Sequence, residues 1–157
     1  MKKIKFFISD IDGVLTDGGM YYSEAGDELK KFNTKDGMGV AILRSLGVEV
    51  VFVTSENTKI NIRRANKLKV KYLFQNVKDK LTYIRKFLET QKVSFDEIAY
   101  IGDDINDIEL LKSVQLSFCP ADAVYEVKNN VNYILDKRGG EGVFREAVEF
   151  LMRNNYV

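Results

Sequence analysis

Two short stretches of this 157-residue sequence gather acidic side chains and glycine directly after apolar runs. In SDIDGVLTDG, Asp10 and Asp12 are two positions apart, so an extended chain points both carboxylates to one side, about 6–7 Å apart. The stretch IGDDINDI adds Asp103, Asp104 and Asp107. Neighbouring carboxylates repel one another unless a cation lies between them, and a ligand set made only of oxygen favours Mg²⁺.

A hydroxyl and an ammonium group occur at similar places along the chain. Thr54 follows the apolar run VEVVFV, and Lys80 follows FQNVKD at the start of a segment with helical spacing. Mg²⁺ usually takes one or two carboxylates together with a substrate phosphate. Thr54 and Lys80 can supply a hydrogen bond and positive charge to phosphate oxygens. A carboxylate beside the cation can then attack phosphorus, which is the chemistry of an aspartyl-phosphate intermediate.

The composition narrows the remaining possibilities. The chain contains no histidine and one cysteine, Cys119, which excludes histidine-based catalysis, most zinc or haem sites and a disulfide framework. The formal net charge is +1, and no basic patch with interleaved aromatics indicates a nucleic-acid partner. No apolar run reaches the ~18–20 residues that span a bilayer, and Ser9 and Asp10 interrupt the one at the N-terminus. We therefore predict a cytoplasmic protein without a membrane partner.

Strand-length apolar runs alternate with segments of helical spacing, and this pattern predicts how the polar residues are positioned. The runs are IKFFI (4–8), VEVVFV (48–53), KYLF (71–74), IAYI (98–101), LSFC (116–119) and YIL (133–135). The alternation predicts an α/β fold, a Rossmann-like open parallel sheet with helices on both faces, in a single domain over residues 1–157. Because parallel strands end along one edge, the polar residues after them should meet there.

One segment departs from the alternation. The stretch GGMYYSEAGDELKKFN, residues 18–33, predicts a β-hairpin around a Glu-Ala-Gly-Asp turn, inserted after the first strand. Its aromatic residues Tyr21, Tyr22 and Phe32 favour packing at an interface over contact with a ligand. A two-stranded ribbon alone is marginally stable in water, so we expect a neighbouring subunit to bury them.

The order of the motifs resembles the haloacid dehalogenase-like phosphatase superfamily. It runs Asp-x-Asp-Gly-Val, apolar-Thr-Ser, Lys and Gly-Asp-Asp-x-x-Asp over residues 10–107. The resemblance implies that Asp10 is the nucleophile and that Asp12 is the general acid and later the general base. It also implies that Thr54 and Lys80 bind the phosphoryl group.

The same resemblance implies the ligands of a Mg²⁺ ion. Asp10, the backbone carbonyl of Asp12 and Asp103 would hold the ion, with Asp107 in support, while the contribution of Asp104 stays open. The stretches DIDGVLTDG, FNTKDGMG and KRGGEGVFREAVE further resemble the cap-less subgroup that hydrolyses 3-deoxy-2-ulosonate phosphates. That subgroup implies the absence of a cap domain and a homotetramer in which hairpins cover neighbouring sites.

The sugar substrate is predicted from the segment after the second strand. Octulosonate 8-phosphate phosphatases commonly have Thr-Gly-Arg where this chain has Thr54, Ser55 and Glu56. The stretch ENTKINIRRANKLKVKYLFQ resembles the nine-carbon branch, in which Glu56 and Lys67 are associated with substrate. We therefore predict 2-keto-3-deoxynononate 9-phosphate, with 3-deoxy-D-manno-octulosonate 8-phosphate as the alternative.

Further cations could bind the sugar carboxylate. Arg64 and Lys67 occupy a predicted helix, where a solvated basic face explains them equally well. Arg138 stands beside two glycines in KRGGEG, a flexible stretch that could close on an anion.

Two other classes of function remain as alternatives. Receiver domains also combine aspartates, a threonine and a lysine, but their phosphoacceptor follows the third strand, where this chain has Gln75 and Asn76. A non-catalytic protein with the same fold would not need the full set of motif residues.

Overall fold

The fold is built on a six-stranded parallel sheet. The computed structural model describes residues 2–26 and 28–157. The sheet has the strand order β5-β4-β1-β6-β7-β8, and its described pairings are all parallel. The strands are β1 (Phe6–Ser9), β4 (Glu49–Val53), β5 (Tyr72–Phe74), β6 (Ile98–Ile101), β7 (Leu116–Cys119) and β8 (Tyr133–Ile134). The predicted α/β class is confirmed, and each predicted run contains a strand.

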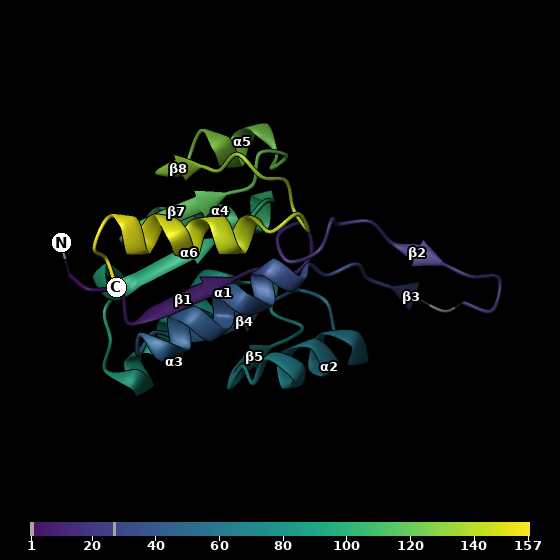
Figure 1. Ribbon diagram of the computed structural model, residues 1–157, viewed down its shortest axis with the longest axis horizontal. Helices are drawn as coiled ribbons and strands as arrows, with labels where there is room; N and C mark the ends of the chain where they lie inside the picture. The colour runs from purple at the N-terminus through teal and green to yellow at the C-terminus, as the bar shows by residue number, and fades with distance from the viewer. Residues whose placement is uncertain (1, 27) are drawn as a thin grey trace.

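Helices cover both faces of this sheet (Figure 1). Helices α1 (Thr34–Ser45), α2 (Lys59–Leu68) and α6 (Val143–Arg153) contribute to one core. Helices α3 (Lys80–Gln91), α4 (Ile108–Ser113) and α5 (Tyr125–Lys128) contribute to the other. Because side chains alternate along a strand, β1 serves both cores, with Phe7 in the first and Phe6 and Ile8 in the second. The central strand is thereby fixed from both sides.

The strand order places a topological switch point beside β1. After β1 the chain adds β4 and β5 on one side and then crosses to add β6, β7 and β8 on the other. The carboxyl ends of β1, β4 and β6 therefore lie next to one another, which is where open α/β sheets bind ligands. Single 3₁₀ turns at Phe95–Glu97 and Ile105–Asp107 lead into β6 and out of it.

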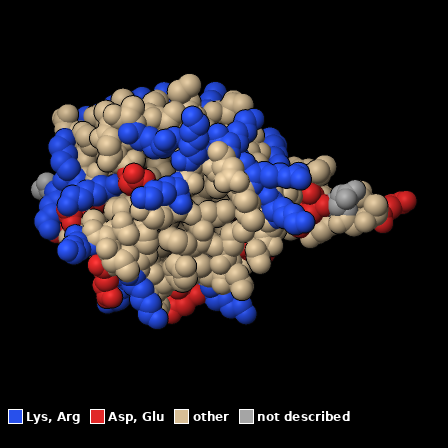
Figure 2. All heavy atoms as spheres, turned by 90° about the horizontal axis from the view of Figure 1, so that it is seen from below, with Lys and Arg blue, Asp and Glu red and all other residues tan. Residues whose placement is uncertain are grey.

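A two-stranded antiparallel ribbon projects from the body of the molecule (Figures 1 and 2). It consists of β2 (Tyr21–Tyr22) and β3 (Glu28–Leu29), with Tyr21 opposite Leu29. An isolated bridge between Thr16 and Phe32 closes its base. The predicted hairpin insertion is confirmed, with shorter strands than the sequence indicates, while the last residue of its predicted turn, Asp27, lies outside the described residues.

The apolar side chains of the ribbon are unburied within this chain. Tyr21, Tyr22 and Leu29 are exposed, and so is Met20 just before β2. The described residues form no cap domain over the strand ends. None of the helices in the described part of the chain is long and apolar enough to cross a membrane.

Candidate active site

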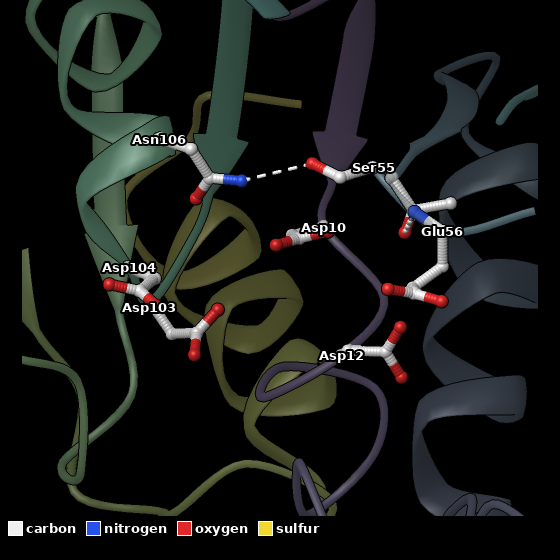
Figure 3. Close-up of a pocket in the computed structure, with 8 residues that line it drawn as sticks. Asp10, Asp12, Ser55, Glu56, Asp103, Asp104 and Asn106 are labelled. Atoms are coloured by element: carbon white, nitrogen blue, oxygen red, sulfur yellow. Dashed lines mark hydrogen bonds between the residues drawn. The ribbon is translucent and has the colours of Figure 1, made fainter. Parts of the chain in front are cut away.

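The polar residues after β1, β4 and β6 surround one pocket, as the parallel sheet predicts (Figure 3). Asp10 follows β1, Thr54 follows β4, and Asp103 follows β6 after Gly102. The pocket has a volume of about 230 Å³ and is lined by Asp10, Asp12, Thr54, Ser55, Glu56, Asp103, Asp104 and Asn106. The sheet thus brings both predicted catalytic carboxylates, the threonine and the predicted metal ligand Asp103 together.

Asp10 is a buried carboxylate held at both oxygens. Its Oδ1 accepts a hydrogen bond of 2.7 Å from the amide of Ile11, and its Oδ2 lies 2.8 Å from Lys80 Nζ. Its own amide donates to Ile101 O on β6 at 3.0 Å. Burial, and then the nearby Asp107, raise the pKa of Asp10 to about 7, although Lys80 opposes the rise. The side chain is therefore positioned like a nucleophile that needs neighbouring positive charge to stay ionised.

Lys80 does not line the pocket and lies between two carboxylates. Its side chain has no exposed surface, and its Nζ is 2.6 Å from Asp107 Oδ1 as well as 2.8 Å from Asp10. Burial lowers the pKa of Lys80, but the two carboxylates outweigh that effect and raise it. The predicted contact of Lys80 with a phosphoryl group stays a prediction, because its described contacts are with Asp10 and Asp107.

Asp107 is buried and serves as a hub for hydrogen bonds. Its Oδ1 accepts from Lys80 and from the hydroxyl of Tyr100. Its Oδ2 accepts from the amides of Asp103 and Asp104, at 3.0 and 3.2 Å. Asp107 thus fixes the turn that carries Asp103, consistent with its predicted supporting role. Tyr100 was missed by sequence reasoning, since a tyrosine within an apolar strand gives no sign of a polar partner.

The geometry fits a divalent cation among the aspartates. Asp10, Asp103 and Asp107 each offer an oxygen, and these oxygens lie within 4.8 Å of one another. Asp103 Oδ1 is buried without a hydrogen-bond partner among the described residues. Burial, followed by Asp10 and Asp107, raises the pKa of Asp103 to about 8. A cation would give the buried oxygen a partner and reverse this effect on the pKa.

Two glycines permit the close packing around these carboxylates. Gly13 has a φ of +83°, and a Cβ there would lie 2.0 Å from Asp103 Oδ2. A Cβ on Gly102 would lie 2.5 Å from Asp107 Cγ. Gly13 is therefore required by the approach of its loop to Asp103, and Gly102 by the close packing of Asp107 against the start of its own turn.

Asp12 lies at the wall of the pocket, with a partner that sequence reasoning missed. Its Oδ2 is 2.8 Å from the Nζ of Lys30, which follows β3 in the ribbon. Its Oδ1 accepts a hydrogen bond of 3.3 Å from Thr16 Oγ1. Lys30 gave no signal in the sequence, because a lysine beside another lysine in a polar hairpin is typical of a solvated surface.

Of the four predicted substrate-binding residues, only Glu56 lines this pocket. Figure 3 shows its carboxylate directed to the space between Asp10 and Asp12. Arg64 and Lys67 line a second groove of about 250 Å³ on α2. Arg64 donates to Asn33 O at 2.8 Å and lies over the ring of Phe32.

Arg138 also lies apart from this pocket. Its Nε is 3.4 Å from Asp122 Oδ2, and it is not among the residues that line the pocket. The chain by itself therefore separates three predicted substrate-binding cations from the catalytic carboxylates.

Ser55 and Asn106 bridge the mouth of the pocket. Asn106 Nδ2 donates to Ser55 Oγ at 3.1 Å, which joins the loop after β4 to the 3₁₀ turn after β6 (Figure 3). Asp104 points away from Asp10 in the same view, and its Oδ1 accepts from the amide of Ile105 at 2.7 Å. Asp104 therefore lines the pocket but caps its own turn.

Comparisons with known proteins agree with this geometry. A family model described as haloacid dehalogenase-like hydrolase matches residues 52–146. The chain is also similar to the 3-deoxy-D-manno-octulosonate 8-phosphate phosphatase KdsC of Haemophilus influenzae. The two are 35% identical over 153 residues, which cover 98% of this chain and 85% of that protein.

Solved structures show the same likeness in three dimensions. The 3-deoxy-D-manno-octulosonate 8-phosphate phosphatase of Yersinia pestis is 34% identical with a TM-score of 0.93, over 98% of this chain and 83% of that one. The enzyme of that name from Moraxella catarrhalis, in complex with a magnesium ion, a phosphate ion and a KDO molecule, is 30% identical with a TM-score of 0.93. That match covers 98% of this chain and 89% of the other.

Proposed function

We propose a substrate for this protein from the premise that the chain belongs to the haloacid dehalogenase-like hydrolases. It is a phosphatase, and Mg²⁺ is its cofactor. We infer that it hydrolyses 3-deoxy-D-manno-octulosonate 8-phosphate, releasing phosphate from the eight-carbon sugar acid. The observation that carries this proposal is the 35% identity over nearly the whole chain to a phosphatase named for that substrate. The predicted preference for the nine-carbon sugar has less support from the comparisons than its alternative.

The proposed mechanism assigns one role to each carboxylate. Asp10 attacks phosphorus and the bond from phosphorus to the sugar oxygen breaks, while Asp12 gives its proton to that oxygen. Asp12, now ionised, takes a proton from a water that attacks the aspartyl phosphate, which releases phosphate and restores Asp10. Mg²⁺, when bound, neutralises charge on the phosphoryl oxygens. Asp10, the backbone carbonyl of Asp12 and Asp103 would hold the ion.

Thr54 and Lys80 complete the proposed active site, Thr54 as a residue that lines the pocket and Lys80 as one that does not. Thr54 lines the pocket, where its hydroxyl can donate to a phosphoryl oxygen. Lys80 does not line it but pairs with Asp10, so its positive charge would act on the phosphoryl group across the nucleophile. Both residues would stabilise negative charge in a transfer that depends mainly on positioning and electrostatics.

The small volume of the pocket supports an active site that a neighbouring subunit completes. Ligand pockets usually measure about 300–1,000 Å³, whereas this one measures about 230 Å³. It can enclose the phosphate end, and the sugar must extend beyond it. We propose a cytoplasmic, single-domain protein that assembles as a homotetramer, in which the exposed apolar ribbon of one subunit covers a neighbouring pocket.

A second candidate substrate is 2-keto-3-deoxynononate 9-phosphate, and Glu56 is the observation that favours it. The carboxylate of Glu56 faces the pocket, where it can accept hydrogen bonds from sugar hydroxyls. Arg64, Lys67 and Arg138 would supply cations for the sugar carboxylate. Each of these cations would have to meet the sugar outside the pocket, across the second groove or through a neighbouring subunit.

The test is a comparison of kcat/KM for the two ulosonate phosphates with Mg²⁺. We expect the eight-carbon substrate to be preferred and simple hexose phosphates to be poor, since a buried polar site rejects analogues that leave its groups unpaired. Glu56→Ala and Lys67→Ala should be measured with both sugars. Lys59→Ala, which changes an exposed lysine on the same helix, is the matched control. A preference for the nine-carbon sugar that disappears in Glu56→Ala would replace the proposal with the second candidate.

A further inference from the structure

We propose that Lys30 is a positioning residue, which fixes the carboxyl group of Asp12 so that, when protonated, it can give its proton to the leaving sugar oxygen. The proposal rests on the role assigned to Asp12 in the proposed function. Lys30 is the first residue after β3, at the base of the ribbon. Its side chain has no exposed surface, its Nζ lies 2.8 Å from Asp12 Oδ2, and the side chain of Asp12 is 25% exposed.

The surroundings of Lys30 leave Asp12 as its main partner. A buried ammonium group is costly unless it is paired. Within the described residues the second carboxylate near Lys30 Nζ is that of Glu28, whose Oε1 is 3.9 Å away. That oxygen is itself buried without a hydrogen-bond partner in this part of the chain. The ammonium group therefore has no exposed surface and is directed to Asp12 at hydrogen-bond distance.

A second contact fixes the other oxygen of Asp12. Thr16 Oγ1 donates to Asp12 Oδ1 at 3.3 Å, and the same hydroxyl accepts from the amide of Gly18 at 3.2 Å. Thr16 is buried and pairs through its backbone with Phe32, two residues beyond Lys30. One oxygen of Asp12 is thus held from its own loop and the other from the ribbon, and the bridge ties those two segments together.

This two-sided contact matters because proton transfer depends on geometry. A general acid must come within hydrogen-bond reach of the atom that it protonates, and small misplacements are expensive. Without Lys30, the carboxyl group of Asp12 would keep the contact to Thr16 but could rotate about it. A purely structural ion pair at the base of the ribbon would instead affect folding without a particular effect on the chemical step.

The test compares Lys30→Met and Lys30→Arg with Lys31→Met. Lys31 is the matched control, because it is the next residue, its side chain is 60% exposed and its nearest carboxylate is 3.8 Å away. With octulosonate 8-phosphate we expect Lys30→Met to lose roughly 10- to 100-fold in kcat, a part of the ~10²–10⁴-fold that general acid–base catalysis contributes. KM should stay within about twofold, and Lys30→Arg should recover part of the loss, since it keeps the charge.

The dependence on the leaving group separates positioning from a structural role. The nitrophenolate of p-nitrophenyl phosphate departs with little help from an acid, so kcat/KM for this substrate should fall at least about fivefold less in Lys30→Met than kcat/KM for the sugar phosphate. Asp12→Asn should show the same dependence. Equal losses on both substrates, or no loss in Lys30→Met, would overturn the proposal for Lys30.

Two further measurements show whether the role of Asp12 or the choice of sugar is at fault if the expected result is not obtained. If Asp12→Asn shows no dependence on the leaving group, its role as the acid is wrong, and the proposal for Lys30 falls with it. If the sugar phosphate is not turned over but p-nitrophenyl phosphate is, the sugar assignment alone fails, and a series of phosphomonoesters with different leaving groups replaces it. Thermal unfolding of all variants excludes misfolding, and Lys30→Gln, which removes the charge but keeps a polar end, carries the test if Lys30→Met is unfolded.

Discussion

Two buried lysines each hold a carboxylate with a proposed catalytic role, one at the edge of the sheet and one at the base of the ribbon. Both side chains have no exposed surface, and both lie 2.8 Å from an aspartate oxygen. Lys80 joins Asp10 to Asp107, two carboxylates that the core encloses almost completely. Lys30 holds Asp12, which is 25% exposed, and it does so from a peripheral insertion.

The difference fits the role proposed for each carboxylate. A nucleophile attacks along one line, so Asp10 gains from a rigid site built on the central strand. A general acid and base must meet first the sugar oxygen and then water, so Asp12 needs access to the pocket. We infer that the sheet fixes the covalent chemistry, while the ribbon adjusts proton transfer.

The largest expected effect comes from removing the nucleophile. Asp10→Asn should abolish turnover with an intact fold, because an amide is a poor nucleophile and cannot form the aspartyl phosphate. Phosphate release and thermal unfolding measure the two properties separately. Asp136→Asn, at an exposed position, is the control. Near-normal turnover in Asp10→Asn would show that the buried site is not where the covalent step occurs.

Removal of the metal should reduce phosphate release about as strongly as Asp10→Asn does. EDTA should stop phosphate release and added Mg²⁺ should restore it, since the single ammonium group of Lys80 cannot offset three carboxylates, each with an oxygen within 4.8 Å of the others, and an incoming phosphate. Asp103→Ala should weaken Mg²⁺ binding in calorimetry. Full activity of the chelated protein would contradict a catalytic metal at this cluster.

The two lysines should differ in their effect on stability. Lys80→Met leaves Asp10 and Asp107 buried without their shared partner, and breaking a buried pair in this way typically costs about 3–5 kcal/mol. Lys30→Met should cost about 1–2 kcal/mol, because Asp12 keeps its contact with water and Thr16. Urea unfolding with Mg²⁺ present gives both values. If both variants lost the same free energy of unfolding, the distinction between a core site and a peripheral one would be wrong.

The smallest expected effect on the isolated chain comes from the tip of the ribbon. Tyr22→Ser with Leu29→Ser removes exposed apolar surface, so it should leave the stability of the folded subunit nearly unchanged. The same double variant should weaken the proposed tetramer, as light scattering at micromolar concentration would report. Lys35→Ser, which changes an exposed residue outside the ribbon, is the control. A tetramer unaffected by the double variant would place the interface elsewhere.

The sequence by itself determined the sheet and the order of the motifs, and through its resemblance to a family it predicted Asp10 as the nucleophile. These features depend on short-range patterns: apolar runs of strand length, the two-residue spacing of Asp10 and Asp12, and glycines beside aspartates. Parallel strands end along one edge, so the pattern along the chain predicts Asp10, Thr54 and Asp103 at that edge, and the strand order in the sheet makes them neighbours. The pocket confirms that placement.

Only the tertiary structure decided which charges pair. Lys80 and Lys30 are both lysines next to polar residues, and nothing local distinguishes them from solvated side chains. Their partners lie far along the chain, and the packing of α3 and of the ribbon brings them within 2.8 Å. In the same way, α2 carries Lys67 into a separate groove, away from Glu56 in the pocket. A buried charge must find an opposite charge to offset its lost hydration, and which partner is within reach is a property of the packed fold.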